Sequence, residues 1–146
     1  MQYRESHLGR IIVASIEHGD DLLVELSNIV AKEKINSAVV LLLGALKEAS
    51  VVVGPKECTV PPVPVWRETN DGREIIGIAT VFKDENGEPS IHMHASLGRG
   101  DSVLTGCIRK GTEVYLLVEA ILFEIEGSGA LRLFDQTKDL KLLGFK

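Results

Sequence analysis

Short runs of hydrophobic residues, separated by glycine, proline or charged residues, recur along most of this chain. Many of these runs are rich in valine and isoleucine. Branched side chains of this kind pack well on a pleated surface, so the runs predict β-strands. The segments with this pattern are residues 10–17, 37–43, 45–53, 73–82, 90–96, 112–126 and 130–143. Two of them, 73–82 and 90–96, flank a turn around Asn86-Gly87 and are expected to pair as a hairpin.

One segment has the spacing of a helix instead. Asp20 or Asp21 can accept the free N–H groups of a first helical turn, and apolar residues follow at helical intervals: Leu22, Leu23, Leu26, Ile29 and Val30. We expect one amphipathic helix from about residue 21 to residue 33. The predicted fold is therefore an α+β domain, a mostly antiparallel sheet with one main helix packed on it.

Glycine and proline interrupt this pattern at three places. Gly44 separates two of the predicted strands and is expected to be a kink. Residues 54–64 contain four of the chain's five prolines and are expected to form an extended loop. Residues 97–111 are rich in glycine and predict a loop with room for one more short strand.

Length, charge and cysteine content narrow the class of protein. The chain has 146 residues, the usual length of a single domain, so we expect one domain over residues 1–146. Its net charge of -5 makes nucleic acid an unfavoured partner. Two cysteines are too few for a disulfide framework, the first residues do not resemble a signal peptide, and the apolar runs are too short to span a membrane. These features favour a cytoplasmic protein.

The clearest candidate for a functional site in the sequence is the pair His92 and His94. Residues i and i+2 of a strand point to the same face, so the two imidazoles are expected side by side. Two neutral imidazoles at this spacing can bind one divalent ion. The nearest soft donor downstream is Cys107, which gives the pattern His-x-His-x12-Cys. Imidazole and thiolate together favour zinc, and three protein ligands leave one position for water or substrate.

Other interpretations of these residues remain open. His-x-His is a common pattern, so the histidines could be solvated side chains of a surface hairpin, and Cys107 could be a small packing residue. Cys107 and His94 could also form a nucleophile pair. Glu74 and Glu119, which interrupt apolar strands, are candidate general bases for a metal-bound water, or they are ordinary exposed positions.

Several segments resemble a known family, the plants-and-prokaryotes conserved (PPC) domain. The resemblance rests above all on His92-Met93-His94-Ala95-Ser96-Leu97 followed by Gly106, with the Gly-Glu-Pro turn that ends at Pro89. Softer matches are residues 9–13, 19–22 and 43–46, and the pair Glu74-Ile75. Together these segments extend the resemblance over nearly the whole chain.

This resemblance implies an α+β fold, a homotrimer and, in prokaryotic members, a metal held by the paired histidines and a third histidine. Here the corresponding position carries Cys107, so the third ligand would be a thiolate. Plant members carry a DNA-binding AT-hook beside the domain. This sequence has no such element: its nearest run, Gly98-Arg99-Gly100, lacks the second arginine and the proline.

We therefore predict a zinc-binding PPC-type protein that forms a homotrimer, with His92, His94 and Cys107 as ligands. One alternative is a zinc-dependent hydrolase that acts on a small molecule, with Glu74 or Glu119 as its base. A second alternative, by analogy with the plant relatives, is a DNA-binding or transcription-associated regulator, whose binding would weaken with salt.

Overall fold

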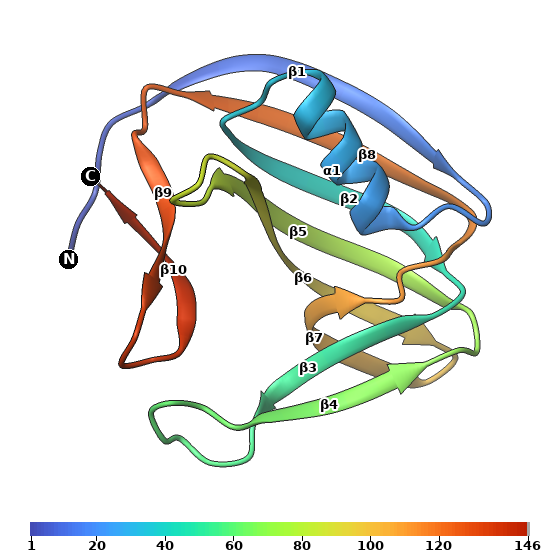
Figure 1. The fold of residues 1–146 in the computed structure, drawn as a ribbon. Helices are drawn as coiled ribbons and strands as arrows, with labels where there is room; N and C mark the ends of the chain where they lie inside the picture. The colour runs from blue at the N-terminus through green and yellow to red at the C-terminus, as the bar shows by residue number, and fades with distance from the viewer. Residues whose placement is uncertain (146) are drawn as a thin grey trace.

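The computed structural model describes residues 1–145, which form an eight-stranded antiparallel sheet, one helix and a two-stranded hairpin (Figure 1). The order of strands across the sheet is β1-β8-β2-β5-β6-β7-β3-β4, and β9 pairs with β10. In chain order the elements are β1 (His7–Glu17), α1 (Leu22–Lys32), β2 (Ser37–Leu46), β3 (Ala49–Pro55), β4 (Pro64–Thr69), β5 (Arg73–Lys83), β6 (Pro89–Arg99), β7 (Ser102–Lys110), β8 (Val114–Glu126), β9 (Ala130–Asp135) and β10 (Leu140–Phe145). No helix within residues 1–145 is long and apolar enough to cross a membrane.

The helix forms where the sequence predicts it. Asp21 is the N-cap, and its Oδ1 accepts the backbone N–H of Val24 at 3.1 Å and the hydroxyl of Thr112 at 2.8 Å. Buried side chains on one side of α1, namely Leu22, Leu26 and Val30, join the hydrophobic core. The cap therefore both starts the helix and ties it to the loop before β8.

The expected α+β class is wrong. Strands contain 64% of the residues and helix only 8%, so the fold is β-rich with one short helix. The additional strands include β4, which follows the proline-rich segment, and β7, which lies in the glycine-rich segment 97–111. The tail, expected as one strand, is the β9–β10 hairpin.

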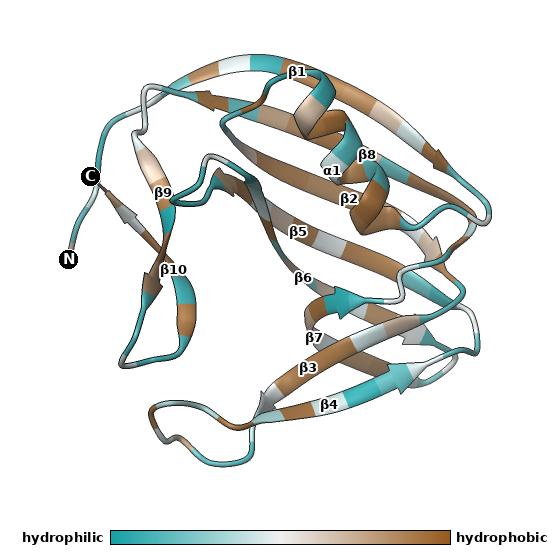
Figure 2. Ribbon diagram, viewed as in Figure 1, coloured by the Kyte–Doolittle hydropathy of each residue, from teal (hydrophilic) through white to brown (hydrophobic). Residues whose placement is uncertain are grey.

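The two faces of the large sheet have different environments. The inner face packs with α1 into one core that includes Val40, Ala79, Met93 and Leu122. The outer face carries large apolar side chains that are exposed in the isolated chain: Ile11, Val13, Leu41, Leu43, Ile76, Ile78 and Leu117. Figure 2 shows the apolar stretches on β1, β8, β2 and β5, which are neighbours in the sheet. We call these seven residues the outer apolar face.

Gly44 is not the break between two strands, because it lies inside β2. Its φ is +151°, and a Cβ there would lie 2.2 Å from the carbonyl oxygen of Leu117. Glycine is needed because β8 passes so closely, and β2 ends only at Leu46. A strand glycine of this kind cannot be distinguished by sequence pattern from one that breaks a strand.

Candidate metal centre

The turn between β5 and β6 fixes the register that positions the two histidines. Oδ1 of Asp84 accepts the N–H groups of Asn86 at 2.9 Å and Glu88 at 3.1 Å, so the side chain closes the turn. In the resulting pairing, the Cα partners of His92 and His94 are Thr80 and Ile78. His92 and His94 flank the buried Met93 and lie on the outer face, as the alternation of a strand requires.

Cys107 on β7 joins the two histidines. It is the Cα partner of His94, so its side chain lies on the same face beside that imidazole. The histidine ring centroids are 4.9 Å apart, and one ligand atom from each of the three residues lies within 4.8 Å of the others. A tetrahedral zinc ion would hold such atoms roughly 3.5 Å apart, so small side-chain rotations would close the set on an ion.

A close approach between strands holds Cys107 in this position. Gly106 is buried, and a Cβ added to it would lie 2.3 Å from the carbonyl oxygen of Val52 on β3. Only glycine allows β3 and β7 to pair here, with Val52 opposite Cys107. The glycine that suggested a loop in the sequence therefore belongs to the scaffold of the site.

The three residues open into a pocket of about 610 Å³, a size usual for small-molecule sites. Its remaining walls come from β3, β4, the loop between them, β7 and β10. They are mostly apolar: Val52, Val53, Gly54, Pro55, Pro62, Pro64, Trp66, Thr105, Gly106, Arg109 and Leu140. The predicted proline-rich loop thus contributes one wall. A ligand that entered the pocket would reach both imidazoles and the thiol.

The surroundings favour the neutral form of the first histidine. Burial of part of the ring lowers the pKa of His92 to about 4, and the positive charges of Arg132 and Arg109 and the neighbouring His94 act in the same direction. His92 is therefore neutral at pH 7 and has a free nitrogen lone pair for a metal. Burial raises the pKa of the Cys107 thiol, so a bound metal would have to displace its proton.

This raised thiol pKa also bears on the nucleophile interpretation. A reactive cysteine needs a thiolate at neutral pH, and burial around Cys107 favours the protonated thiol. A divalent cation is the partner that would stabilise the thiolate here. The arrangement suits metal ligation better than nucleophilic attack by Cys107 with His94 as its base.

The pKa of His92 predicts a pH effect on the metal-free protein. The folded pKa of about 4 lies below the ordinary value of 6.5, so the unfolded chain binds more protons between these pH values. The free energy of unfolding should therefore fall as the pH drops from 6.5 to 4. Because part of the ring is exposed, we expect a contribution of about 1 kcal/mol, well below the full linkage value.

Chemical denaturation of the metal-free protein at pH 7.5 and pH 4.5 measures this effect. Replacing His92 with glutamine, which cannot titrate, should make the loss of stability at low pH smaller by about 1 kcal/mol. An equal loss in the wild-type protein and the His92→Gln variant would contradict the lowered pKa.

Neither candidate base lies near the histidines. Glu74 is four residues from Ile78, the Cα partner of His94, which corresponds to about 13 Å along β5. Glu74 lines a different pocket, near Asp71 and Arg99. Glu119 lies three strands from β6, or about 14 Å away across the sheet. Both carboxylates are exposed, as expected if they are ordinary surface positions and not general bases.

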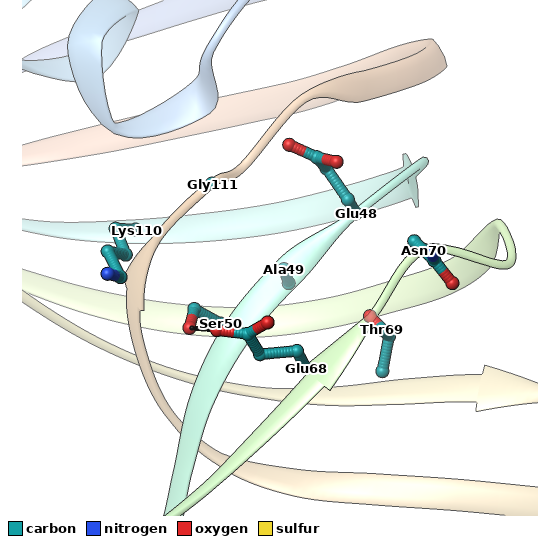
Figure 3. Close-up of a pocket in the computed structure, with 8 residues that line it drawn as sticks. All are labelled: Glu48, Ala49, Ser50, Glu68, Thr69, Asn70, Lys110 and Gly111. Atoms are coloured by element: carbon teal, nitrogen blue, oxygen red, sulfur yellow. Dashed lines mark hydrogen bonds between the residues drawn. The ribbon is translucent and has the colours of Figure 1, made fainter.

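A smaller pocket of about 330 Å³ lies where β3 begins and β4 ends (Figure 3). Its wall carries the side chains of Ser50, Glu68 and Lys110. The hydroxyl of Ser50 donates to Oε1 of Glu68 at 3.3 Å, so two of these polar groups bind each other. Among residues 1–145, no histidine or cysteine lines this pocket, so it lacks the ligand set found around His94.

The sequence interpretation missed two arginines near the site. Arg109 follows Cys107 by two residues on β7, so strand alternation could have placed it on the same face. Arg132 is brought close by the β9–β10 hairpin, where its Nη2 donates to Oγ1 of Thr80 at 2.6 Å. Lys141 on β10 holds the hairpin to the Asp84 turn, with 2.8 Å between Nζ and Oδ2. No spacing in the sequence predicts this contact.

Comparison with solved structures supports the same fold. A Pyrococcus horikoshii plant- and prokaryote-conserved protein is 25% identical, with a TM-score of 0.85 over 100% of this chain and 99% of its own. A metal-containing protein of Archaeoglobus fulgidus is 22% identical, with a TM-score of 0.85 over 97% of this chain and 98% of its own. A candidate DNA-binding protein of Ralstonia eutropha is 21% identical, with a TM-score of 0.75 over 92% of this chain and 90% of its own.

No curated protein matches the chain in sequence. A model of the Plants and Prokaryotes Conserved (PCC) domain, in contrast, matches residues 3–126. The match includes α1, the strands β1 to β8 and all three candidate ligands. The resemblance noted in the His-x-His segment is thus confirmed, and the chain belongs to the Plants and Prokaryotes Conserved domain family.

Proposed function

We propose that this chain is a single-domain zinc-binding protein of its family and that it assembles as a homotrimer. The proposed zinc ligands are His92, His94 and Cys107. The observation that carries the metal proposal is the convergence of two imidazoles and one thiol within 4.8 Å on one face of the sheet. The metal-containing relative from Archaeoglobus fulgidus supports it.

The donor set fits zinc better than a harder cation. Nitrogen and sulfur donors favour zinc, whereas magnesium and calcium prefer oxygen, and no carboxylate of the described residues lines the pocket. Three protein ligands would leave one zinc position facing the pocket, where the ion would act as a Lewis acid toward a bound molecule. His92, His94 and Cys107 would hold the ion, while the apolar walls would exclude water from its surroundings.

The outer apolar face supports the assembly. Soluble monomers rarely expose a large contiguous apolar patch, yet Ile76 and Ile78 are 68% and 56% exposed in the isolated chain. Their Cα partners on β2, Leu43 and Leu41, are exposed as well, so the patch is continuous across strands. Contact with further copies of the chain would cover it. The number three comes from the family resemblance.

The hydrolase alternative has weaker support. A zinc-bound water needs a base within hydrogen-bond reach, directly or through one water, and Glu74 and Glu119 are each more than about 10 Å from the ligands. The DNA-binding alternative rests on distant relatives that are described as DNA-binding proteins, and the net charge of -5 opposes it. We therefore propose a metal-binding role.

We also propose a cytoplasmic location, because a reducing compartment would keep Cys107 as a free thiol.

Elemental analysis tests the metal proposal. Protein purified without added metal, and washed with a weak chelator, is expected to contain about one zinc ion per chain, as a single three-ligand site would hold. The same preparation should contain little iron, nickel or copper. Protein that contains no zinc and takes up none from a zinc buffer would contradict the proposal.

A further inference from the structure

The pocket beside the candidate ligands carries positive charge without any balancing carboxylate. We propose that it binds a small carboxylic acid with an apolar body, whose carboxylate group contacts Arg109 and the metal position. This inference rests on the proposed metal centre for one of its two contacts. It assigns the class of small molecule that the pocket takes.

Arg109 supplies the direct contact. Arg109 follows Cys107 by two residues on β7, and both residues line the pocket. Within residues 1–145, no aspartate or glutamate lines this pocket, and none lies within ion-pair distance of Arg109. In a protein with a net charge of -5, a pocket whose only charged wall residue is an arginine favours an anion.

Arg132 adds a second positive charge behind His92. The residue is only 7% exposed, and its Nη2 donates to Thr80, the Cα partner of His92. Its Nε is buried and has no hydrogen-bond partner among the described residues. A buried guanidinium without a counter-ion is costly, and a nearby anion would offset part of that cost. Arg132 is not on the pocket wall, so its role would be to attract the anion through its charge.

The remaining walls select the body of the ligand. Pro55, Pro62, Trp66 and Leu140 present apolar surface, and the volume of about 610 Å³ has room for an aromatic or branched aliphatic group. A small hydrated anion such as phosphate would leave these walls in contact with water. An apolar acid would instead bury its body against them while its head group stays near the charges.

A carboxylate is the head group that matches both contacts. The planar guanidinium of Arg109 can donate two parallel hydrogen bonds to a carboxylate. Carboxylate oxygen is also an ordinary fourth ligand for zinc. A single head group could therefore bridge Arg109 and an ion held by His92, His94 and Cys107.

Trp66 provides the readout, because it is the only tryptophan of the chain and lines the pocket. The zinc-loaded protein is titrated with phenylacetate while its tryptophan fluorescence is recorded. Phenylacetate is expected to give a saturable change, at a concentration at least about tenfold below that needed for 2-phenylethanol, acetate or inorganic phosphate. 2-Phenylethanol tests the contribution of the apolar body alone, whereas acetate and inorganic phosphate test the contribution of the anionic group alone.

Two charge-matched variants locate the contact. Arg109→Gln is expected to weaken phenylacetate binding about 10- to 100-fold, the usual loss for a charge-assisted hydrogen bond. Lys110→Gln removes the same charge from the next residue of β7, which lines the other pocket, and should bind phenylacetate like the wild type. Equal weakening in both variants would overturn the proposed contact, because it would indicate a general charge effect.

Zinc analysis of the same samples separates this inference from the proposed function. With zinc present, either no saturable binding or equal affinity for phenylacetate and 2-phenylethanol overturns the carboxylate pocket and leaves the metal centre intact. With zinc absent, binding that depends on Arg109 overturns the metal centre and supports the pocket. Absence of both zinc and phenylacetate binding overturns both.

Discussion

Replacing His94 with alanine is expected to reduce the zinc content from about one ion per chain to less than about a tenth of that, after a wash with a weak chelator. His94 is the central member of the candidate set, since its ring lies 4.9 Å from that of His92 and its Cα partner is Cys107. Two remaining ligands cannot hold zinc against a chelator. Elemental analysis after buffer exchange measures the loss.

Ser96→Ala is the matched control for this substitution. Ser96 lies on the same strand, two residues beyond His94, and its hydroxyl is 2.8 Å from that of Thr105. The variant should keep its zinc. Full zinc content in His94→Ala would contradict the proposed centre, whereas equal loss in both variants would point to a general disturbance of β6.

The third ligand can be tested by exchanging its chemistry. The family resemblance implies a histidine at this position in prokaryotic members. Cys107→His restores that ligand, so the variant should retain zinc. Cys107→Ala should lose most of its zinc in the chelator wash, because it removes the sulfur donor and leaves only two ligands of the set. Full zinc retention in Cys107→Ala would reject the thiol as a ligand and leave the two histidines in place.

Placing a charge on the outer apolar face is expected to separate the proposed trimer into monomers. Ile76 lies on β5 within that face, is 68% exposed in the isolated chain and pairs with Leu43 on β2. An aspartate at this position would be buried without a partner in each interface of the proposed trimer, at a cost of about 3 kcal/mol or more per interface. Light scattering should give the mass of three chains for the wild type and one chain for Ile76→Asp.

Val24→Asp controls for the added charge. Val24 is 53% exposed and lies on α1, away from the outer apolar face, so this variant should remain a trimer. Circular dichroism should show folded β-structure in both variants. A wild-type protein with the mass of one chain, or an Ile76→Asp variant with the mass of three, would contradict the assembly.

The sequence predicted the local geometry of the site because that geometry depends on short-range rules. Strand alternation correctly put His92 and His94 on one face, and the Asn86-Gly87 turn correctly paired their strand with β5. The helix start at Asp21 followed from capping chemistry in the same way. In each case the signal lies within a few residues of the feature that it predicts.

The features that the sequence failed to predict depend on close approaches between distant segments. Gly44 and Gly106 suggested a kink and a loop, but both lie inside strands whose neighbours leave no room for a Cβ. Residues 97–111, expected as a loop with room for one short strand, contain the nine-residue strand β7. Arg132 and Trp66 reach the site from other parts of the chain, and only the packing of the β9–β10 hairpin and of β4 brings them there.

X-ray absorption at the zinc edge of the zinc-loaded protein tests the ligand set most directly. The predicted spectrum contains one sulfur scatterer at about 2.3 Å and nitrogen scatterers from two imidazoles at about 2.0–2.1 Å. In Cys107→His the sulfur contribution should vanish while the zinc remains. A wild-type spectrum without sulfur, or with oxygen donors alone, would contradict a centre built from His92, His94 and Cys107.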